Sequence, residues 1–275
     1  MPELPEVETT IRGLYILKNK KIIKVSVNTK KLRYLIPNSL NNLLKNQNII
    51  KIHRIAKYII IDLNNNNSLI IHLGMSGRLK IIKDNYLKQK HDHFILHFDQ
   101  NYFMILNDSR KFGFIDITKT KELFSKKYIS NLGIDALSRK LNAKYFYKKV
   151  NKSNVDIKQI LLNQNIISGI GNIYASEILF DARISPFEKG CNLTIIQIGN
   201  LITSIKKIIR KAITFGGSSI RDYRASDGTI GNFQLNFKVY GKVKKKINNY
   251  RIIKTIQHGR STYYCPELQK EQNSN

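Results

Sequence analysis

The sequence has few cysteines and few acidic residues, and each shortage excludes a class of protein. Only Cys191 and Cys265 occur among 275 residues, so neither a disulfide framework nor a four-cysteine zinc site can form within one chain. The 19 acidic residues stand against 47 basic ones, which gives a formal net charge of +28. This excess is extreme for an enzyme of small anionic metabolites and favours a polyanionic partner, above all nucleic acid.

Long apolar segments are missing as well. No run approaches the roughly 18 residues that cross a bilayer, and the N-terminus lacks a basic region followed by an apolar core. We therefore expect a cytoplasmic protein. Its length suffices for two modest domains, each with a core of its own.

The hydrophobic pattern changes about halfway along the chain. Residues 22 to about 117 contain short alternating or apolar segments at regular intervals, which predict a β-sandwich or barrel. From about residue 132 the period becomes close to 3.6, which predicts helices. The expected strands are residues 23–27, 58–62, 69–72, 79–82, 94–98 and 102–106, and the expected helices are residues 155–162, 173–180 and 193–213.

These patterns predict an α+β protein in three parts. An opening helix and a β-sandwich form residues 2–120, and a helical domain forms residues 132–232. Within the helical domain, residues 216–231 are rich in glycine, serine and aspartate without periodicity, which indicates a loop. Alternation returns in residues 236–268 and predicts a terminal β-hairpin.

The first eight residues combine a possible nucleophile with paired carboxyls. Pro2 is small enough to allow removal of the initiator methionine, which leaves a secondary amine that can attack an aldehydic sugar carbon. An α-amino group has a pKa of about 7.7–8.0, so part of it is free base at neutral pH. Glu3 and Glu6 can protonate a sugar oxygen and shuttle protons. Prolines and acidic residues also suit the first turn of a helix, and the two interpretations are compatible.

Further candidate residues lie in turns. Lys57 begins a predicted strand, where a lone lysine is by itself typical of a solvated strand edge. Met75 lies between two glycines in a tight turn after His72, where a methionine has no core to fill. His91 and His93 are two residues apart without a third ligand of convincing spacing, so we do not expect zinc there.

A glycine pair precedes the helix that starts near residue 173. Glycines at positions 169 and 171, just before a helix, are typical of an anion site in which backbone N–H groups at the positive end of the helix dipole bind the anion, although such a pair can also be an ordinary turn.

Taken together, these motifs resemble the formamidopyrimidine-DNA glycosylases, base-excision enzymes that use an N-terminal proline as nucleophile. The resemblance runs from residue 2 to about residue 265, with the motifs in the family's order. The matching stretches are MPELPEVET, RIAKY, HLGMSG, KHDH, RKFG and GIGNIYASE. It implies that residues 132–232 form a helix-two-turns-helix DNA-binding domain with a lesion-recognition loop at residues 216–231. It also implies a bacterial, nucleoid-associated monomer whose partner is damaged double-stranded DNA.

The resemblance also implies roles for the catalytic residues. Pro2 would attack the sugar C1′, with Glu3 as the principal acid and Glu6 as its partner. Lys57 would assist β-elimination, and Arg260 would serve δ-elimination.

Other residues match the family's DNA contacts. Met75 would fill the space of a flipped-out nucleotide, Arg110 would read the orphaned cytosine, and Phe112 would wedge the base stack. The expected contacts elsewhere, mostly to phosphates, are His72, His91, Lys152, Lys158 and Asn172. Ser109 and Lys111 depart from the family's pattern of a proline and a second arginine.

The resemblance implies a bifunctional glycosylase and abasic-site lyase that acts on formamidopyrimidines and 8-oxoguanine. One alternative is an endonuclease VIII-like enzyme for oxidised pyrimidines, but PELPEVE, LGMSG and the loop at residues 216–231 favour the purine branch. Another is a noncatalytic nucleic-acid-binding protein, against which Pro2, Glu3 and Lys57 argue.

The C-terminal hairpin departs from the family, which usually closes it around zinc with two cysteine pairs. Ile247 and Tyr250 occupy the places of the first pair, and of the second only Cys265 remains. His258 would raise the ligand count only to two, whereas structural zinc needs four. We therefore expect no cofactor and a zincless finger at residues 236–268. Its predicted replacement core is Ile247, Tyr250, Ile252 and Ile256.

Overall fold

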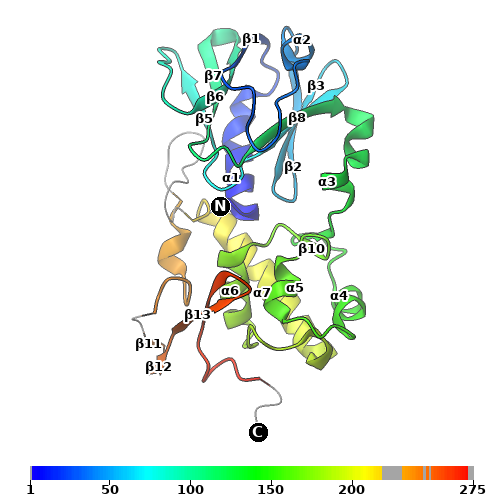
Figure 1. The fold of residues 1–275 in the computed structure, drawn as a ribbon, viewed down its shortest axis with the longest axis vertical. Coiled ribbons are helices and arrows are strands. Elements are labelled where there is room, and N and C mark those ends of the chain that lie inside the picture. The colour runs from blue at the N-terminus through cyan, green and yellow to red at the C-terminus, as the bar shows by residue number, and fades with distance from the viewer. Residues whose placement is uncertain (1, 219–230, 244–245, 248, 272–275) are drawn as a thin grey trace. The chain divides into compact units, whose positions relative to one another are not determined.

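The computed structural model describes residues 2–218, 231–243, 246–247 and 249–271 (Figure 1). Contacts divide the chain into two compact units, of which the first is Met1–Ser130 with Phe215–Gln234 and the second is Asn131–Thr214 with Leu235–Asn275. The predicted helical domain extended to residue 232, whereas the structure groups Phe215–Gln234 with the first unit. Most of the predicted loop at residues 216–231 lies outside the described residues.

The first unit contains two four-stranded antiparallel sheets. One has the order β1-β6-β7-β5 and the other the order β2-β3-β4-β8. The strands of the first sheet are β1 (Ile22–Val27), β5 (Arg78–Lys83), β6 (Asp92–Phe98) and β7 (Tyr102–Asn107). Those of the second are β2 (Ile49–Ile55), β3 (Tyr58–Leu63), β4 (Asn67–His72) and β8 (Phe114–Lys119).

Helical segments of the first unit are short apart from the opening helix. They are α1 (Leu4–Leu14), η1 (Tyr15–Leu17), α2 (Leu40–Leu44), η2 (Asp99–Asn101), η3 (Thr120–Ser125) and α3 (Lys127–Ser130). Helix α1 packs against β2, β3 and β5. It forms as the sequence pattern predicts, because Leu4, Val7, Ile11 and Leu14 make one buried face.

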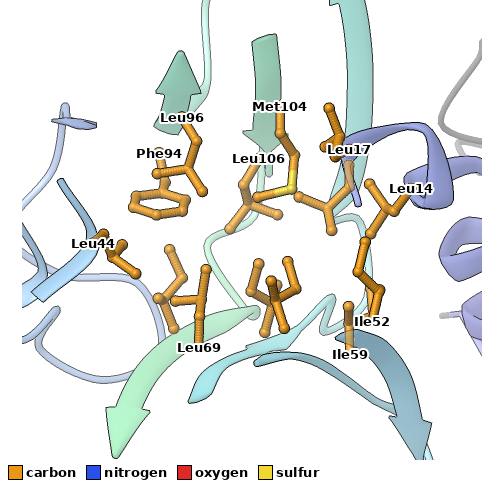
Figure 2. Packing of buried hydrophobic residues seen from close by; sticks show 14 of the residues in the cluster. Leu14, Leu17, Leu44, Ile52, Ile59, Leu69, Phe94, Leu96, Met104 and Leu106 are labelled. Carbon is orange, nitrogen blue, oxygen red and sulfur yellow. The ribbon is translucent and has the colours of Figure 1, made fainter. Parts of the chain in front are cut away.

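One apolar cluster joins the two sheets. Ile59 and Leu69 of one sheet and Phe94 and Leu96 of the other belong to it, and Leu14 of α1 adds to it (Figure 2). Each fully buried side chain of this size contributes roughly 1.5–3 kcal/mol. The predicted β-sandwich is therefore confirmed.

Strand β1 differs in detail from the predicted alternation. Ile23 and Val27 are exposed, whereas Ile22 is fully buried. The pairing of β1 with β6 shifts register between Ile22 and Lys24, and such an irregularity changes which residues face the core.

The second unit is mainly helical. Its helices are α4 (Ala143–Val150), α5 (Ile157–Leu162), α6 (Asn172–Asp181), η4 (Gly190–Asn192) and α7 (Ile195–Thr214). The short helix η5 (Phe233–Asn236) begins in the last residues of the first unit and ends in the second. Helix α4 was not predicted, because only Phe146 and Val150 of its eight residues are buried and the rest is lysine and tyrosine rich.

Short strands complete the second unit. The strands β9 (Ile134–Asp135) and β10 (Ile167–Ser168) pair in parallel, and β11 (Lys246–Ile247) pairs with β12 (Tyr250–Arg251). The predicted terminal hairpin is present as β13 (Ile253–Gln257) and β14 (Arg260–Tyr264). None of the described helices is long and apolar enough to cross a membrane.

Candidate active site and nucleic-acid interface

The carboxyl groups of Glu3 and Glu6 cap the start of α1, and each accepts the backbone N–H of the other residue. The Glu3 side chain accepts the N–H of Glu6, and Oε2 of Glu6 accepts the N–H of Glu3 at 2.8 Å, which is a reciprocal capping box. Both residues are 2% exposed, and Pro2 beside them is also buried. The helix-opening interpretation is therefore confirmed, and the same bonds hold both carboxyls in defined positions next to the chain end.

The other carboxylate oxygen of Glu6, Oε1, binds the segment at Gly217 and Ser218, which is distant in the sequence. The N–H and the Oγ of Ser218 donate to Oε1 of Glu6 at 2.7 and 3.0 Å. Gly217 makes this approach possible, because it adopts φ 76° and a Cβ there would lie 2.9 Å from Oε1 of Glu6. Ser218 was not among the predicted site residues, since no local pattern relates it to Glu6.

Lys57 lies in the two-residue turn between β2 and β3, just before the strand it was expected to begin. Ala56 in this turn has φ 51°, a left-handed conformation. Arg54 braces the turn, because its Nη1 donates to the carbonyl of Ala56 at 2.9 Å and its Nε donates to Oε2 of Glu8 at 3.0 Å. Since Glu8 belongs to α1, the opening helix fixes the position of the turn that carries Lys57, which is only 7% exposed.

Strand register gathers several predicted residues at one end of the second sheet. Tyr58 pairs with His72, and His72 pairs with Phe114. Lys57 precedes Tyr58, the turn that holds Met75 follows His72, and Phe112 comes two residues before Phe114. These segments therefore meet where β3, β4 and β8 begin or end.

Strand pairing in the first sheet also places these segments at one end of the sandwich. Asn107 at the end of β7 pairs with Arg78 at the start of β5 and with Asp92 at the start of β6. His91 directly precedes β6, and Arg110 follows β7 by three residues. The turn that carries Met75 and the loop that carries Arg110 each connect one sheet to the other, so both lie at this end of the sandwich.

A buried carboxyl group ties that turn to that loop. Oδ1 of Asp108 accepts the hydroxyl of Ser76 at 2.5 Å, and Oδ2 accepts the N–H of Gly113 at 2.8 Å. The contact is close, because a Cβ on Gly74 would lie 2.3 Å from the backbone carbon of Phe112. Neither Asp108 nor Ser76 was among the predicted site residues, and only the structure shows that they hold the turn and the loop together.

The three side chains proposed to enter the DNA, Met75, Arg110 and Phe112, are all exposed. Met75 is 43% exposed and Phe112 is 42% exposed. The guanidinium carbon of Arg110 lies 4.7 Å from the centre of the Phe112 ring, a cation–π contact.

His91 and His93 differ in burial and in their contacts. His93 is buried, and its Nε2 lies 2.9 Å from the carbonyl oxygen of Asp108, which can only accept, so this nitrogen carries the proton. Burial lowers the pKa of His93. His91 adopts φ 72° just before β6 and is only partly buried. In the described part of the chain no group of three or more His, Cys, Asp or Glu side chains could hold a metal ion.

His72 is a neutral imidazole in the folded protein. Burial, together with the nearby charges of Lys57 and Arg33, lowers the pKa of His72 to about 4. Its Nδ1 accepts the N–H of Gly74 at 3.1 Å, so the single proton lies on Nε2. The ring also stacks on Phe114 with 5.5 Å between centroids. His72 can therefore offer a phosphate a neutral hydrogen bond.

The second unit carries the other predicted DNA contacts. Lys152 and Arg260 are exposed, and Asn172 opens helix α6. The Nδ2 of Asn172 donates to the carbonyl of Ser261 at 2.9 Å, which links α6 to the hairpin.

Lys158 departs from its expected role as a phosphate contact. Its side chain is fully buried, and Nζ donates to Oγ1 of Thr262 at 2.7 Å and to the carbonyl of Ser261 at 3.1 Å. A lysine ammonium is costly to bury unless it is hydrogen-bonded, which these acceptors provide. Lys158 therefore holds strand β14 instead of reaching solvent.

The hairpin presents Arg260 at a tight turn. Gln257 pairs with Arg260, and the two intervening residues, His258 and Gly259, have φ 48° and 72°. Positive φ at both positions is typical of the type I′ turn, which matches the twist of the flanking strands.

An apolar cluster lies where a zinc ion would be expected by resemblance. Phe180, Val239, Ile252 and Cys265 are buried together, and Ile247, Tyr263 and Leu268 pack against them. Burial raises the pKa of the Cys265 thiol, which disfavours the thiolate that binds zinc. The residues of the finger therefore do not fit a metal centre.

The predicted composition of this core was partly wrong. Tyr250 and Ile256 are 42% and 74% exposed, so they do not contribute. Ile256 points away because its neighbour Gln257 is buried, and successive residues of a strand face opposite sides. Residues 237–240 lie in the segment where alternation predicted a hairpin, but they form no strand and instead surround the Glu177 carboxyl group, which accepts the N–H groups of residues 238, 239 and 240 at 2.8 to 3.0 Å.

Comparison with known proteins agrees with this geometry. The family models for the formamidopyrimidine-DNA glycosylase N-terminal domain and H2TH domain match residues 1–115 and 132–224. Formamidopyrimidine-DNA glycosylases of Zymomonas mobilis and Wolbachia pipientis are 44% and 43% identical to this chain over 272 residues, which is 98% of this chain and 100% of each relative.

Solved structures of Lactococcus lactis Fpg are also similar. A mutant bound to DNA containing Fapy-dG and a complex with DNA containing an abasic site each have a TM-score of 0.90 and 34% identity, covering 98% of this chain and 100% of the other. These matches define a glycosylase of the H2TH class. The chain belongs to the formamidopyrimidine-DNA glycosylase family.

The ionisation of His72 gives a testable prediction about pH. The unfolded chain binds a proton to this histidine near pH 6.5, whereas the folded chain does so only near pH 4, so stability is lost as pH falls between about 6.5 and 4. We expect His72→Asn to reduce this loss, since its amide oxygen can accept the N–H of Gly74 without titrating. Urea unfolding at pH 7 and pH 4.5 measures the difference, and an NMR titration of His72 near pH 6.5 would contradict it.

Proposed function

We infer that this protein is a bifunctional DNA glycosylase and abasic-site lyase of base excision repair that excises oxidised purines such as formamidopyrimidines and 8-oxoguanine. The observation that carries this conclusion is the capped carboxyl pair of Glu3 and Glu6, held next to Pro2 at the chain end. Family membership over nearly the whole chain supports it, as does the Fapy-dG substrate in the similar Lactococcus lactis complex.

In the proposed reaction, the amine of Pro2 attacks the sugar C1′. The C1′–N bond to the damaged base breaks, the base leaves with the bonding electrons, and a proton supplied through Glu3 opens the sugar ring to an iminium. The iminium withdraws electrons, so loss of the C2′ proton expels the 3′ phosphate, and a second elimination expels the 5′ phosphate. We propose that Lys57 assists the first elimination and Arg260 the second.

Three exposed side chains of the first unit have proposed roles once the damaged nucleotide has been flipped out of the duplex. We propose that Met75 occupies the space that the extruded nucleotide leaves, that Phe112 wedges the base stack, and that Arg110 bonds the opposite base. Extrusion costs a few kcal/mol, which apolar wedges offset in part. Asp108 would keep these wedges in one arrangement, because it fastens both of their loops.

An endonuclease VIII-like preference for oxidised pyrimidines is the second candidate. One Lactococcus lactis Fpg structure contains DNA with an oxidised pyrimidine, so lesion preference needs direct competition between the two substrate types. As a repair enzyme of chromosomal DNA, the protein would act at the bacterial nucleoid as a monomer.

The first prediction for this function concerns the nucleophile. We expect borohydride to crosslink the protein to an 8-oxoguanine duplex through Pro2 once Met1 is removed, because reduction of an iminium gives a stable amine. An acetylated terminus should abolish trapping, whereas Pro2→Gly keeps a primary amine and can retain part of it. Efficient trapping by the blocked protein would move the nucleophile elsewhere, with Lys57 the first suspect.

The second prediction concerns salt. Each phosphate contact made by a charged side chain releases about 0.9 counterions, so Lys152→Ala should lower the slope of log K against log salt by about one. His72→Asn and Asn172→Ala serve as controls, since both wild-type side chains are neutral, and they should weaken binding at an unchanged slope. An unchanged slope for Lys152→Ala would place that lysine away from the DNA.

The third prediction concerns the finger, which we propose folds without metal. Cys265→Ala should keep lesion cleavage and lower the free energy of unfolding by about 1 kcal/mol, because it removes one buried atom. Ile252→Ala, in the same cluster, should lower it by about 2–5 kcal/mol. Stoichiometric zinc by elemental analysis, or loss of cleavage with a chelator, would contradict a metal-free finger.

A further inference from the structure

Asp156 is the centre of an ionic cluster that none of the roles above uses. Its carboxyl group is buried, and Oδ1 accepts the Lys189 ammonium at 2.5 Å. Oδ2 accepts Nε2 of Gln257 at 2.7 Å and lies 3.3 Å from Nε2 of His258. Asp156 precedes helix α5 but its side chain does not cap that helix. Two of its three partners instead belong to the β13–β14 hairpin.

The cluster continues along the hairpin through an unbroken series of hydrogen bonds. Oγ1 of Thr262 donates to Oε1 of Gln257 at 3.1 Å, and Nζ of Lys158 donates to that Oγ1 at 2.7 Å. Lys158 also donates to the carbonyl of Ser261, which Asn172 shares. The series therefore joins Asp156 to the start of helix α6.

Arg260 is next to two residues of this series but is not itself one of them. Its cross-strand partner is Gln257, and the next residue along the strand is Ser261, both of which are held by the cluster. The Arg260 side chain remains exposed. The cluster thus holds the Gln257 side chain across the hairpin from Arg260 and the backbone carbonyl of the adjacent Ser261, and leaves the Arg260 side chain exposed.

Removal of the Asp156 charge would weaken the hydrogen bonds that Asp156 accepts from the hairpin. Burial alone would raise the pKa of Asp156, but hydrogen bonds from Lys189, Gln257 and His258 outweigh it and hold the pKa below its ordinary value. The charged carboxylate satisfies one of the two N–H groups of the buried Gln257 amide, whose other N–H donates to the carbonyl of Pro186 at 3.0 Å. A neutral Asn at this position has only one acceptor oxygen, so its NH2 group faces either Lys189 or Gln257, which are both donors. One donor then loses its acceptor, which favours movement of the turn.

We propose that Asp156 is a positioning residue for Arg260, which sets the geometry in which the β13–β14 turn meets a DNA phosphate. This rests on the proposed function. Since Asp156 acts only through the hairpin, its loss should affect the step assigned to Arg260 and leave the chemistry of Pro2 in place.

The test uses Asp156→Asn in the full chain, with a duplex that contains an abasic site. We expect DNA affinity to fall about tenfold, the loss of roughly one charged hydrogen bond. The ratio of δ- to β-elimination product should fall as well. The yield of borohydride trapping at saturating DNA should stay at the wild-type level. Asp156→Glu, which restores the charge, should recover part of the δ-product.

Asp181→Asn is the matched control. Asp181 makes an ion pair of 2.7 Å with Lys207 in the same unit, and neither residue belongs to the series that reaches the hairpin. It should leave affinity and product ratio unchanged. Lys189→Met removes the half-exposed partner of Asp156 and should lower the same ratio by a smaller factor, which keeps the proposal testable if Asp156→Asn does not fold.

A double-mutant cycle with Arg260→Ala separates positioning from general stability. If Asp156 acts through Arg260, Asp156→Asn should change the product ratio little in the Arg260→Ala background. Equal effects in both backgrounds, an unchanged ratio in the single variant, or trapping that falls in proportion to affinity would each overturn the proposal. Absence of trapping by the wild-type protein would instead refute the proposed function itself.

Discussion

Glu6, Asp108, Asp156 and Glu177 are buried carboxyl groups, and each accepts hydrogen bonds from a segment distant in the chain. Their partners lie 212, 32, 101 and 62 residues away, at Ser218, Ser76, Gln257 and Val239. Burial makes every such bond obligatory, because a carboxyl group without donors would bear its full desolvation cost. The hydrogen bonds to these four carboxyl groups therefore position the functional loops and the hairpin.

The use of acids inside the protein has an electrostatic consequence. The chain has 19 acidic residues against 47 basic ones, and these four are hidden from solvent. Exposed basic side chains such as Lys152, Arg110 and Arg260 are therefore opposed by even fewer surface carboxylates than composition suggests. Such a surface attracts a polyanion over a distance, which suits an enzyme that must find rare lesions on DNA.

The C-terminal finger illustrates two kinds of stabilisation in a small volume. Its apolar half is the cluster around Ile252 and Cys265, and its polar half is the series from Asp156 to Asn172. Apolar burial stabilises the hairpin without defining its position closely, whereas hydrogen bonds of fixed direction define the turn at Arg260. A finger that folds without metal, as we propose for this protein, needs both, because neither alone gives stability and orientation together.

The sequence by itself determined the local features of this protein. Alternating or apolar segments specified six of the eight strands of the first unit but not β2 or β8. A glycine on either side of Met75 specified its turn, and the opening octamer specified a helix start with a family signature, because each depends on neighbours within a few residues. Only the tertiary structure decided that Lys158 is buried, that His72 is neutral and that Ile256 is exposed. Those outcomes depend on Ser261, Lys57 and Gln257 and on burial, and no local pattern records which distant groups will surround a side chain once the chain has folded.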